Sequence, residues 1–157
     1  LGPPVATARK APGCEADRPG KWVDVPSASW TIPALADEVG PVRWAAVQFA
    51  RDEGVPDLTL ENVRLAVSEA VTNAVLHAFR THRAPGTVTV TVAVTSGVLV
   101  EVVVRDDGMG MSARTDSPGL GLGLPLISAA ADAVEHRVPA EGDGLELWMC
   151  FRFGDGP

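Results

Sequence analysis

The chain of 157 residues lacks several features by which broad classes of protein are recognised. No apolar stretch approaches the roughly 18 uncharged residues of a membrane-spanning helix, and residues 1–20 contain no apolar segment typical of a secretory signal. Cys14 and Cys150 are too few for a disulfide scaffold, and neither has a Cys or His nearby at zinc-ligand spacing. We therefore expect a cytoplasmic protein in which both cysteines are bystanders.

Positive charge and the common phosphate-binding motifs are also missing. The net charge is −7 and no basic stripe is present, so we expect neither nucleic acid nor an anionic membrane as a partner. The motif G-x-x-x-x-G-K-[ST] is absent, and G-x-G-x-x-G fails because Leu124 follows Gly123 where a third glycine should stand. These absences exclude a P-loop and a dinucleotide-binding fold, and they favour a protein or small-molecule partner.

The length of the chain and its hydrophobic fraction of 46% fit one globular domain. Seven of the first twenty residues are Gly or Pro, which predicts a flexible arm over residues 1–20 and a folded domain over residues 21–157. Two short extended pieces are predicted at the start of this domain, over residues 21–25 and 27–33.

Hydrophobic periodicity predicts three helices. The first follows Pro41, and the second covers residues 59–80 with Thr59 as its cap. The apolar stripe of the second helix consists of Val63, Ala66, Val67, Ala70, Val71, Ala74 and Ala78. The third covers residues 124–134, with Pro125 in its first turn, where proline is tolerated.

Alternating apolar residues predict two β-hairpins. Residues 87–95 and 98–105 form the first around a Ser96-Gly97 turn, and the second pairs residues 135–138 with 145–153. This order of helices and strands predicts an α+β fold: a two-layer sandwich of one mostly antiparallel mixed sheet with helices on a single face.

The first hairpin runs into two acids and two glycines, in the sequence RDDGMGM. Strand alternation places Asp106 on the buried face, after the valines at positions 98, 100, 102 and 104. The opposite, wetter face receives Glu101, Arg105 and Asp107. A buried carboxylate is costly unless donors meet it, and Gly108 and Gly110 leave room for a ligand that supplies them. A glycine turn with an exposed Asp106 is the alternative.

Three polar residues of the second helix, Glu69, Asn73 and His77, lie on one line at the edge of its apolar stripe. The carbonyl oxygen of Asn73 is a hard ligand suited to Mg²⁺, and Glu69 can orient or deprotonate a nucleophile. Alternatively, Glu69 is solvated, Asn73 is a hydrogen-bonded boundary amide and His77 is structural.

The sequence SPGLGLGLPLI places Gly119, Gly121 and Gly123 at every second position before a helix. A helix start exposes unpaired N–H groups and a partial positive charge, so this loop can wrap the phosphates of a nucleotide. Residues 112–118, between the two glycine segments, are polar and suit a mobile lid. Arg114 within them either meets a phosphate or is a solvated arginine.

Taken together and in this order, the segments resemble the GHKL ATPase superfamily and, within it, the bacterial anti-sigma-factor serine kinases. SEAVTNAVLHA resembles the N box of that family, RDDGMGM its first glycine box and SPGLGLGLPLI its second. The resemblance covers residues from about 30 to 153, nearly the whole predicted domain.

The resemblance implies a Bergerat-type ATP site. Asp106 would accept the adenine amino group, Asn73 would hold Mg²⁺ against the phosphates, and Glu69 would be the general base. Gly108 and Gly110 would flank the base, while glycines of the second box contact phosphates under the lid. The implied cofactor-binding residues are Asn73, His77, Asp106, Gly108, Gly110, Met111, Gly119, Leu120, Gly121, Leu122, Gly123 and Leu124.

The implied activity is transfer of the γ-phosphoryl group of ATP to a serine of a STAS-type anti-anti-sigma partner. Such kinases also hold a sigma factor inactive, form homodimers and regulate transcription in stress or sporulation. The family usually has Thr after the last glycine, whereas Leu145 follows Gly144 here, which removes one expected contact near the adenine.

Three alternatives to this kinase activity are open. An ATP-binding partner-switching module without kinase activity is the first, although binding alone does not require Glu69. A histidine kinase would need a helical hairpin presenting a phosphoacceptor histidine, for which an arm of about 20 residues has no room. A free-standing ATPase would lack a transducer domain to use the hydrolysis.

Overall fold

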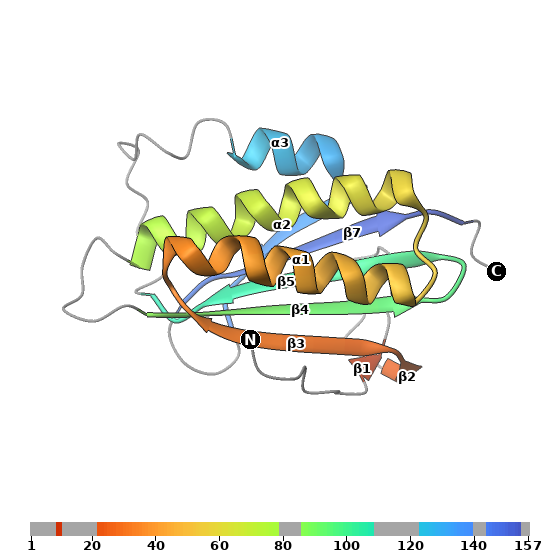
Figure 1. Cartoon of the computed structure of the whole chain (residues 1–157), viewed down its shortest axis with the longest axis horizontal. Helices are drawn as coiled ribbons and strands as arrows, with labels where there is room; N and C mark the ends of the chain where they lie inside the picture. Colours follow the sequence, from red (N-terminus) through yellow and green to blue (C-terminus); the bar gives the residue numbers. More distant parts are fainter. Residues whose placement is uncertain (1–8, 11–21, 79–85, 109–122, 140–143, 155–157) are drawn as a thin grey trace.

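A computed structural model describes residues 9–10, 22–78, 86–108, 123–139 and 144–154. Helices cover one face of a five-stranded sheet (Figure 1). The sheet strands are β3 (Ser27–Pro33), β4 (Thr87–Thr95), β5 (Leu99–Asp106), β6 (Ala133–Arg137) and β7 (Glu146–Arg152). The helices are α1 (Ala36–Asp52), α2 (Asp57–Ala78) and α3 (Gly123–Ala130). The predicted α+β sandwich is therefore confirmed.

The strand order β3-β4-β5-β7-β6 places the last strand of the chain between β5 and β6. Every pairing within the described sheet is antiparallel, so the parallel pair implied by a mixed sheet does not occur in this part of the chain. One row across the sheet, facing the helices, shows how alternation builds the core: Ala28, Val92, Val102, Met149 and Val134.

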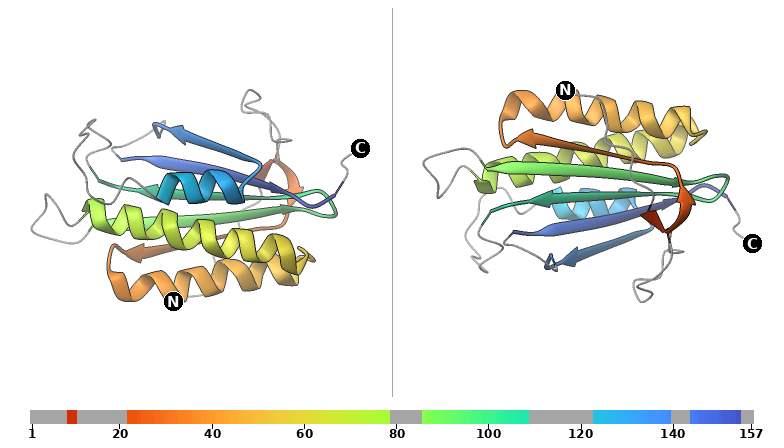
Figure 2. Two further views of the ribbon diagram at one scale, coloured as in Figure 1. Left: turned by 90° about the horizontal axis from the view of Figure 1, so that it is seen from above. Right: turned by 90° about the horizontal axis from the view of Figure 1, so that it is seen from below.

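Helices α1 and α2 pack side by side on the sheet, and α3 lies next to α2 (Figure 2). The predicted stripe of α2 is buried from Val63 to Ala74 and packs on β4, β5 and β7. Burial of this apolar stripe favours the packing, because removing such surface from water contributes about 25 cal/mol per Å². None of the helices in the described residues has the length and apolar character needed to span a bilayer.

Helix boundaries differ from the predictions. Helix α1 begins at Ala36, so Pro41 lies inside it. The acidic residues Asp37 and Glu38 in the first turn favour this earlier start. Helix α2 begins at Asp57, which makes Thr59 a buried residue of the first turn instead of a cap. Helix α3 ends at Ala130, because the residues predicted to continue it turn into β6 and pair with β7.

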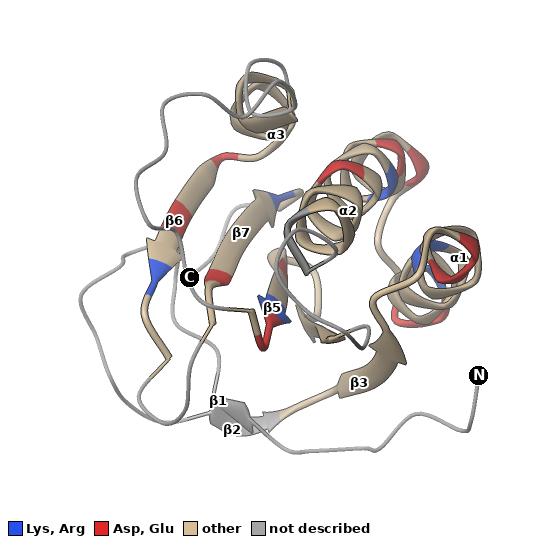
Figure 3. Cartoon of the chain, turned by 90° about the vertical axis from the view of Figure 1, so that its left-hand side faces the viewer, with Lys and Arg blue, Asp and Glu red and all other residues tan. Residues whose placement is uncertain are grey.

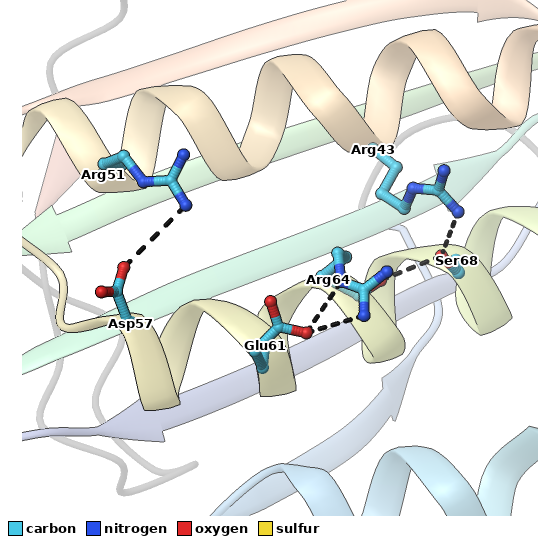
Figure 4. A network of polar contacts seen from close by, with 6 residues as sticks. All are labelled: Arg43, Arg51, Asp57, Glu61, Arg64 and Ser68. Atoms are coloured by element: carbon cyan, nitrogen blue, oxygen red, sulfur yellow. Dashed lines mark hydrogen bonds and ion pairs between the residues drawn. The ribbon is translucent and has the colours of Figure 1, made fainter.

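A network of polar side chains joins the exposed sides of α1 and α2 (Figure 4). Arg43 donates a hydrogen bond of 3.2 Å to the Ser68 hydroxyl, which donates to the carbonyl oxygen of Arg64 at 2.9 Å. Arg64 in turn forms an ion pair of 2.7 Å with Glu61. Because Arg64 and Glu61 are exposed, their ion pair contributes only about 0–1 kcal/mol.

The face of the sheet opposite the helices is not uniformly wet. A two-stranded sheet of β1 (Arg9–Lys10) and β2 (Trp22–Val25) lies on this face, and β2 contacts β4 (Figure 2). Glu101 is on this face as predicted, but it is only 1% exposed and accepts a hydrogen bond from Trp148 Nε1. The expectation that Glu101 lies on a wetter face is therefore wrong.

The cysteine prediction is also wrong for Cys150, which is fully buried on this same face and disulfide-bonded. A disulfide partner is selected by proximity in the folded chain, which spacing along the sequence does not reveal. Cys14 lies outside the described residues, as does most of the predicted flexible arm at residues 1–20.

Candidate active site

Two polar residues of α2 that the helical wheel singled out, Glu69 and Asn73, are half-buried on the side of the helix that meets α3. They are close to the first residue of α3, because a Cβ built on Gly123 would lie 2.8 Å from Asn73 Nδ2 and 3.3 Å from Glu69 Oε2. The glycine therefore leaves the space that lets both polar groups face the start of α3.

This arrangement explains locally why a glycine precedes the apolar residues of α3. A side chain at position 123 would have to displace the amide of Asn73, since 2.8 Å is shorter than real Cβ contacts. Ile127, one turn later, is fully buried and holds α3 against the core. The N-terminal end of a helix, with its unpaired N–H groups, is thereby packed against a carboxylate and an amide.

Asp106 closes β5 and faces the helices, as alternation predicts. It pairs with Val88, which is fully buried in the core, and residues directly opposite each other in a sheet share a face. The carboxylate is half-buried, and its Oδ1 accepts a hydrogen bond of 2.9 Å from the N–H of Gly108. The inward orientation is confirmed, and one backbone donor contributes to it.

The start of β7 holds the backbone of Asp106 from the side. Its N–H donates to the carbonyl oxygen of Leu145 at 3.0 Å. Gly144 has φ of +118° and packs so closely that a Cβ there would overlap the carbonyl oxygen of Asp106. Leu145 therefore meets Asp106 through its main chain, a contact that does not depend on its side chain.

These segments meet at one end of the sandwich. The C-terminal end of α2, the end of β5 and the first residue of α3 all lie at the left of Figure 1. In Figure 3 the same end faces the viewer, with acidic residues at the end of β5 and α2 above them. The fold thus brings together the predicted helix, strand and second glycine box.

Several predicted site residues lie outside the described residues: Gly110, Met111, Gly119, Leu120, Gly121 and Leu122, together with Arg114 and the rest of the predicted lid. His77 belongs to α2, but its side chain is also outside the described set. Leu124 is half-buried and packs against the core. The described part of the site is therefore Glu69, Asn73, Asp106, Gly108, Gly123 and Leu124.

The donor set fits magnesium bound together with phosphate. No group of three His, Cys, Asp or Glu side chains suited to a metal occurs among the described residues. The amide oxygen of Asn73 and the carboxylate of Glu69 are hard oxygen donors, and Mg²⁺ is commonly held by one or two such groups plus phosphates and waters. Asn73 could therefore hold a metal only together with the phosphates of a nucleotide.

Sequence reasoning missed one pair beside Asp106. Thr87, the first residue of β4, donates its N–H and its hydroxyl to the two carboxylate oxygens of Asp107, at 2.7 and 2.9 Å. The signal was available, because counting back from the Ser96-Gly97 turn pairs residue 87 with residue 107. Thr87 and Asp107 line a polar groove of about 270 Å³, and Asp106 lines the same groove.

Comparisons with known proteins bear on this geometry. Residues 32–151 match the family described as histidine kinase-like ATPase domain. The serine-protein kinase RsbW of Bacillus licheniformis is 35% identical over 122 residues, which cover 74% of this chain and 67% of RsbW. The blue-light-activated histidine kinase 2 of Erythrobacter litoralis is 43% identical over 94 residues, covering 59% of this chain. The chain spans only 24% of the length of that kinase.

Solved structures share the fold. The RsbU and RsbW domains of a Mycobacterium tuberculosis protein align with a TM-score of 0.59 at 21% identity, over 81% of this chain and 32% of that one. The histidine kinase domain of the Erythrobacter litoralis blue-light-activated kinase aligns with a TM-score of 0.51 at 28% identity, over 76% of this chain and 61% of that one. The first similarity shows the fold alone.

Proposed function

The chain belongs to the histidine kinase-like ATPase family, in its anti-sigma-factor serine kinase branch, and on that premise we propose that it transfers a phosphoryl group from ATP to a serine of a protein partner. The observation that carries the proposal is the convergence of Glu69 and Asn73 with Gly123, at the end of the sandwich where Asp106 closes β5. ATP and Mg²⁺ are the proposed cofactors.

Each residue has a role that its position supports. Asp106 is a half-buried acceptor that can take a hydrogen bond from the amino group of adenine, while Gly108 leaves space beside it. Asn73 offers an amide oxygen that stays a ligand at any pH. Glu69, one turn earlier on α2, can accept the proton of a serine hydroxyl. Bound ATP would supply the phosphoryl group, and most catalysis would come from positioning.

The partners are part of the proposal. The similarity to RsbW supports an anti-anti-sigma protein of the STAS type as the phosphoacceptor, a sigma factor as the sequestered partner and a homodimer as the assembly. A cytoplasmic location, and a role in stress or sporulation transcription, are proposed on the same similarity. The argument for the cytoplasm from unpaired cysteines does not hold, because Cys150 is disulfide-bonded.

Binding of Mg·ATP by calorimetry tests the site. Asp106→Ala should abolish measurable binding while the circular dichroism spectrum stays that of the wild type, because the acceptor for the adenine amino group is gone. Asp132→Ala is the matched control, since Asp132 also accepts a backbone N–H at a sheet edge, from Arg152 at 2.6 Å. Equal ATP affinity in the Asp106→Ala protein would contradict the proposed nucleotide site.

Phosphotransfer to a candidate partner tests the reaction. Glu69→Gln should bind ATP with wild-type affinity but transfer at least about 100-fold more slowly, because general bases contribute roughly 10²–10⁴-fold. Glu61→Gln, on the same helix and exposed, controls for the loss of a carboxylate from α2. Binding without any transfer in the wild type would favour the partner-switching module that lacks kinase activity.

A second candidate is the catalytic domain of a histidine kinase, which the 43% identity to the blue-light-activated kinase favours. The chemistry of the product separates the two candidates. A phosphoserine partner keeps its label in acid, whereas phosphohistidine loses it. Acid-labile label on the partner would overturn the serine kinase proposal in favour of the histidine kinase.

A further inference from the structure

Asp107 and Thr87 form a two-point clamp on the helix-free face of the sheet. The carboxylate of Asp107 accepts the N–H of Thr87 at 2.7 Å through Oδ1 and the Thr87 hydroxyl at 2.9 Å through Oδ2. The main chains add a third bond, from the N–H of Asp107 to the carbonyl oxygen of Thr87 at 3.2 Å. Both residues are exposed, so the core does not require them.

The clamp lies one residue past Asp106. The pair Thr87 and Asp107 extends the β4 and β5 ladder by one step beyond Val88 and Asp106. Because neighbouring side chains of a strand point to opposite faces, Asp107 bonds to Thr87 of β4 on the helix-free face, while Asp106 faces the helices. On its other side, Asp106 is bonded to the carbonyl oxygen of Leu145 at 3.0 Å. The strand end is thus held from both neighbouring strands.

Strand ends fray unless side chains or neighbouring strands fix them. Recognition of a base by one carboxylate requires its oxygens within about 0.5 Å and 10–20° of the productive geometry. The hydrogen bond between Asp106 Oδ1 and the Gly108 N–H, at 2.9 Å, orients the carboxylate only within its own turn. The turn that contains Asp106 and Gly108 can still move as a unit if the end of β5 moves. The hydrogen bonds between the Asp107 carboxylate and Thr87 hold the end of β5 to β4.

We propose that Asp107 and Thr87 are positioning residues for recognition of the purine base: by fastening the end of β5 to β4, they fix the direction in which Asp106 presents its carboxylate. This inference rests on the proposed nucleotide site and adds two residues to it. They touch no ligand themselves, since they act from the opposite face of the strand.

The test compares Mg·ATP with Mg·ITP, whose base has a carbonyl oxygen in place of the amino group. Thr87→Val deletes the hydroxyl donor with little change of shape, Thr87→Ser restores it, and Asp107→Ala removes the whole carboxylate. The matched control is Thr31→Val, which deletes a hydroxyl hydrogen bond of the same length, 2.9 Å to Thr89, in the same sheet. Calorimetry gives the dissociation constants, and thermal unfolding reports folding.

We expect Thr87→Val to weaken ATP binding about fivefold and Asp107→Ala about tenfold, as the losses of one hydrogen bond and of the whole carboxylate suggest. ITP affinity should change less than about twofold, so that the preference for ATP over ITP shrinks. Thr87→Ser and Thr31→Val should keep both the affinity and the preference of the wild type.

Four outcomes overturn the inference. Wild-type ATP affinity and preference in Asp107→Ala would show that the clamp positions nothing, while the nucleotide site itself stands. Equal loss of ATP and ITP binding would show a structural role only. A wild-type protein without preference for ATP over ITP would remove the amino-group recognition on which the clamp acts, and one without ATP binding would overturn the nucleotide site as well.

Discussion

Replacing Glu101 by glutamine should remove a pH dependence from the stability of this protein. Glu101 is 1% exposed; its Oε1 accepts the Trp148 Nε1–H at 2.9 Å, and its Oε2 has no hydrogen-bond partner among the described residues. Burial raises the pKa of this carboxyl from 4.5 to about 7, against the opposing effects of the Trp148 hydrogen bond and the Arg137 charge.

The sign follows from which state keeps the proton. Between pH 4.5 and about 7 the unfolded carboxyl is ionised while the folded one remains protonated. The contribution of Glu101 to stability is therefore greatest below pH 4.5, falls as the pH rises towards 7 and levels off above it. With 1.36 kcal/mol for each pKa unit, the loss between about pH 5 and pH 8 amounts to roughly 2.5 kcal/mol.

Urea unfolding of the wild type and of Glu101→Gln, from about pH 5 to pH 8, measures this loss. Glutamine imitates the protonated acid, because its carbonyl oxygen still accepts from Trp148 and its NH₂ group replaces the O–H. The free energy of unfolding of the variant, relative to that of the wild type, should rise by about 2.5 kcal/mol from about pH 5 to pH 8. Trp148→Phe should raise the pKa of Glu101 further, as followed by carboxyl carbon NMR. A stability difference that stays constant with pH would refute the reasoning.

Three glycine substitutions give further predictions. Gly123→Ala should weaken Mg·ATP binding about tenfold or more by displacing Asn73, whose Nδ2 a Cβ would meet at 2.8 Å; unchanged affinity in calorimetry would contradict this placement. Gly144→Ala should cost about 2 kcal/mol or more in urea unfolding, because φ is +118° and a Cβ would overlap the carbonyl oxygen of Asp106. Gly40→Ala, in α1 with nothing beyond its chain neighbours within 4 Å of a Cβ, should change stability by less than about 1 kcal/mol, because the helical gain of about 0.5–1 kcal/mol is opposed by crowding against the ring of Pro41; a larger loss would show further crowding there.

Local patterns were sufficient for the elements that carry the candidate site. The alternating valines of residues 87–105 predicted two paired strands and the inward direction of Asp106, and both were found. The wheel of α2 predicted that Glu69 and Asn73 share one side at the edge of the stripe, which their half-buried positions confirm. Periodicity succeeds here because backbone geometry alone fixes which side chains share a face.

The ends of the helices were predicted less well than the helices themselves, because tertiary contacts decide where a helix stops. Pro41 read as a start signal, yet α1 begins at Ala36. The apolar run into Val134 read as helix, yet its last residues form β6 and pair with β7. Boundaries depend on competing tertiary contacts, such as strand pairing, which no local window contains.

By itself, the sequence determined the α+β class, the pairing within each hairpin, the position of Glu69 and Asn73 at the edge of the α2 stripe and the position of Asp106 at the end of β5. Only the tertiary structure decided that β7 lies between β5 and β6, that Glu101 is buried with a raised pKa, and that Gly123 packs on Asn73. Periodicity records the geometry of one segment at a time, whereas burial, pKa and close approach are set by the segments that pack against it, however distant in the chain.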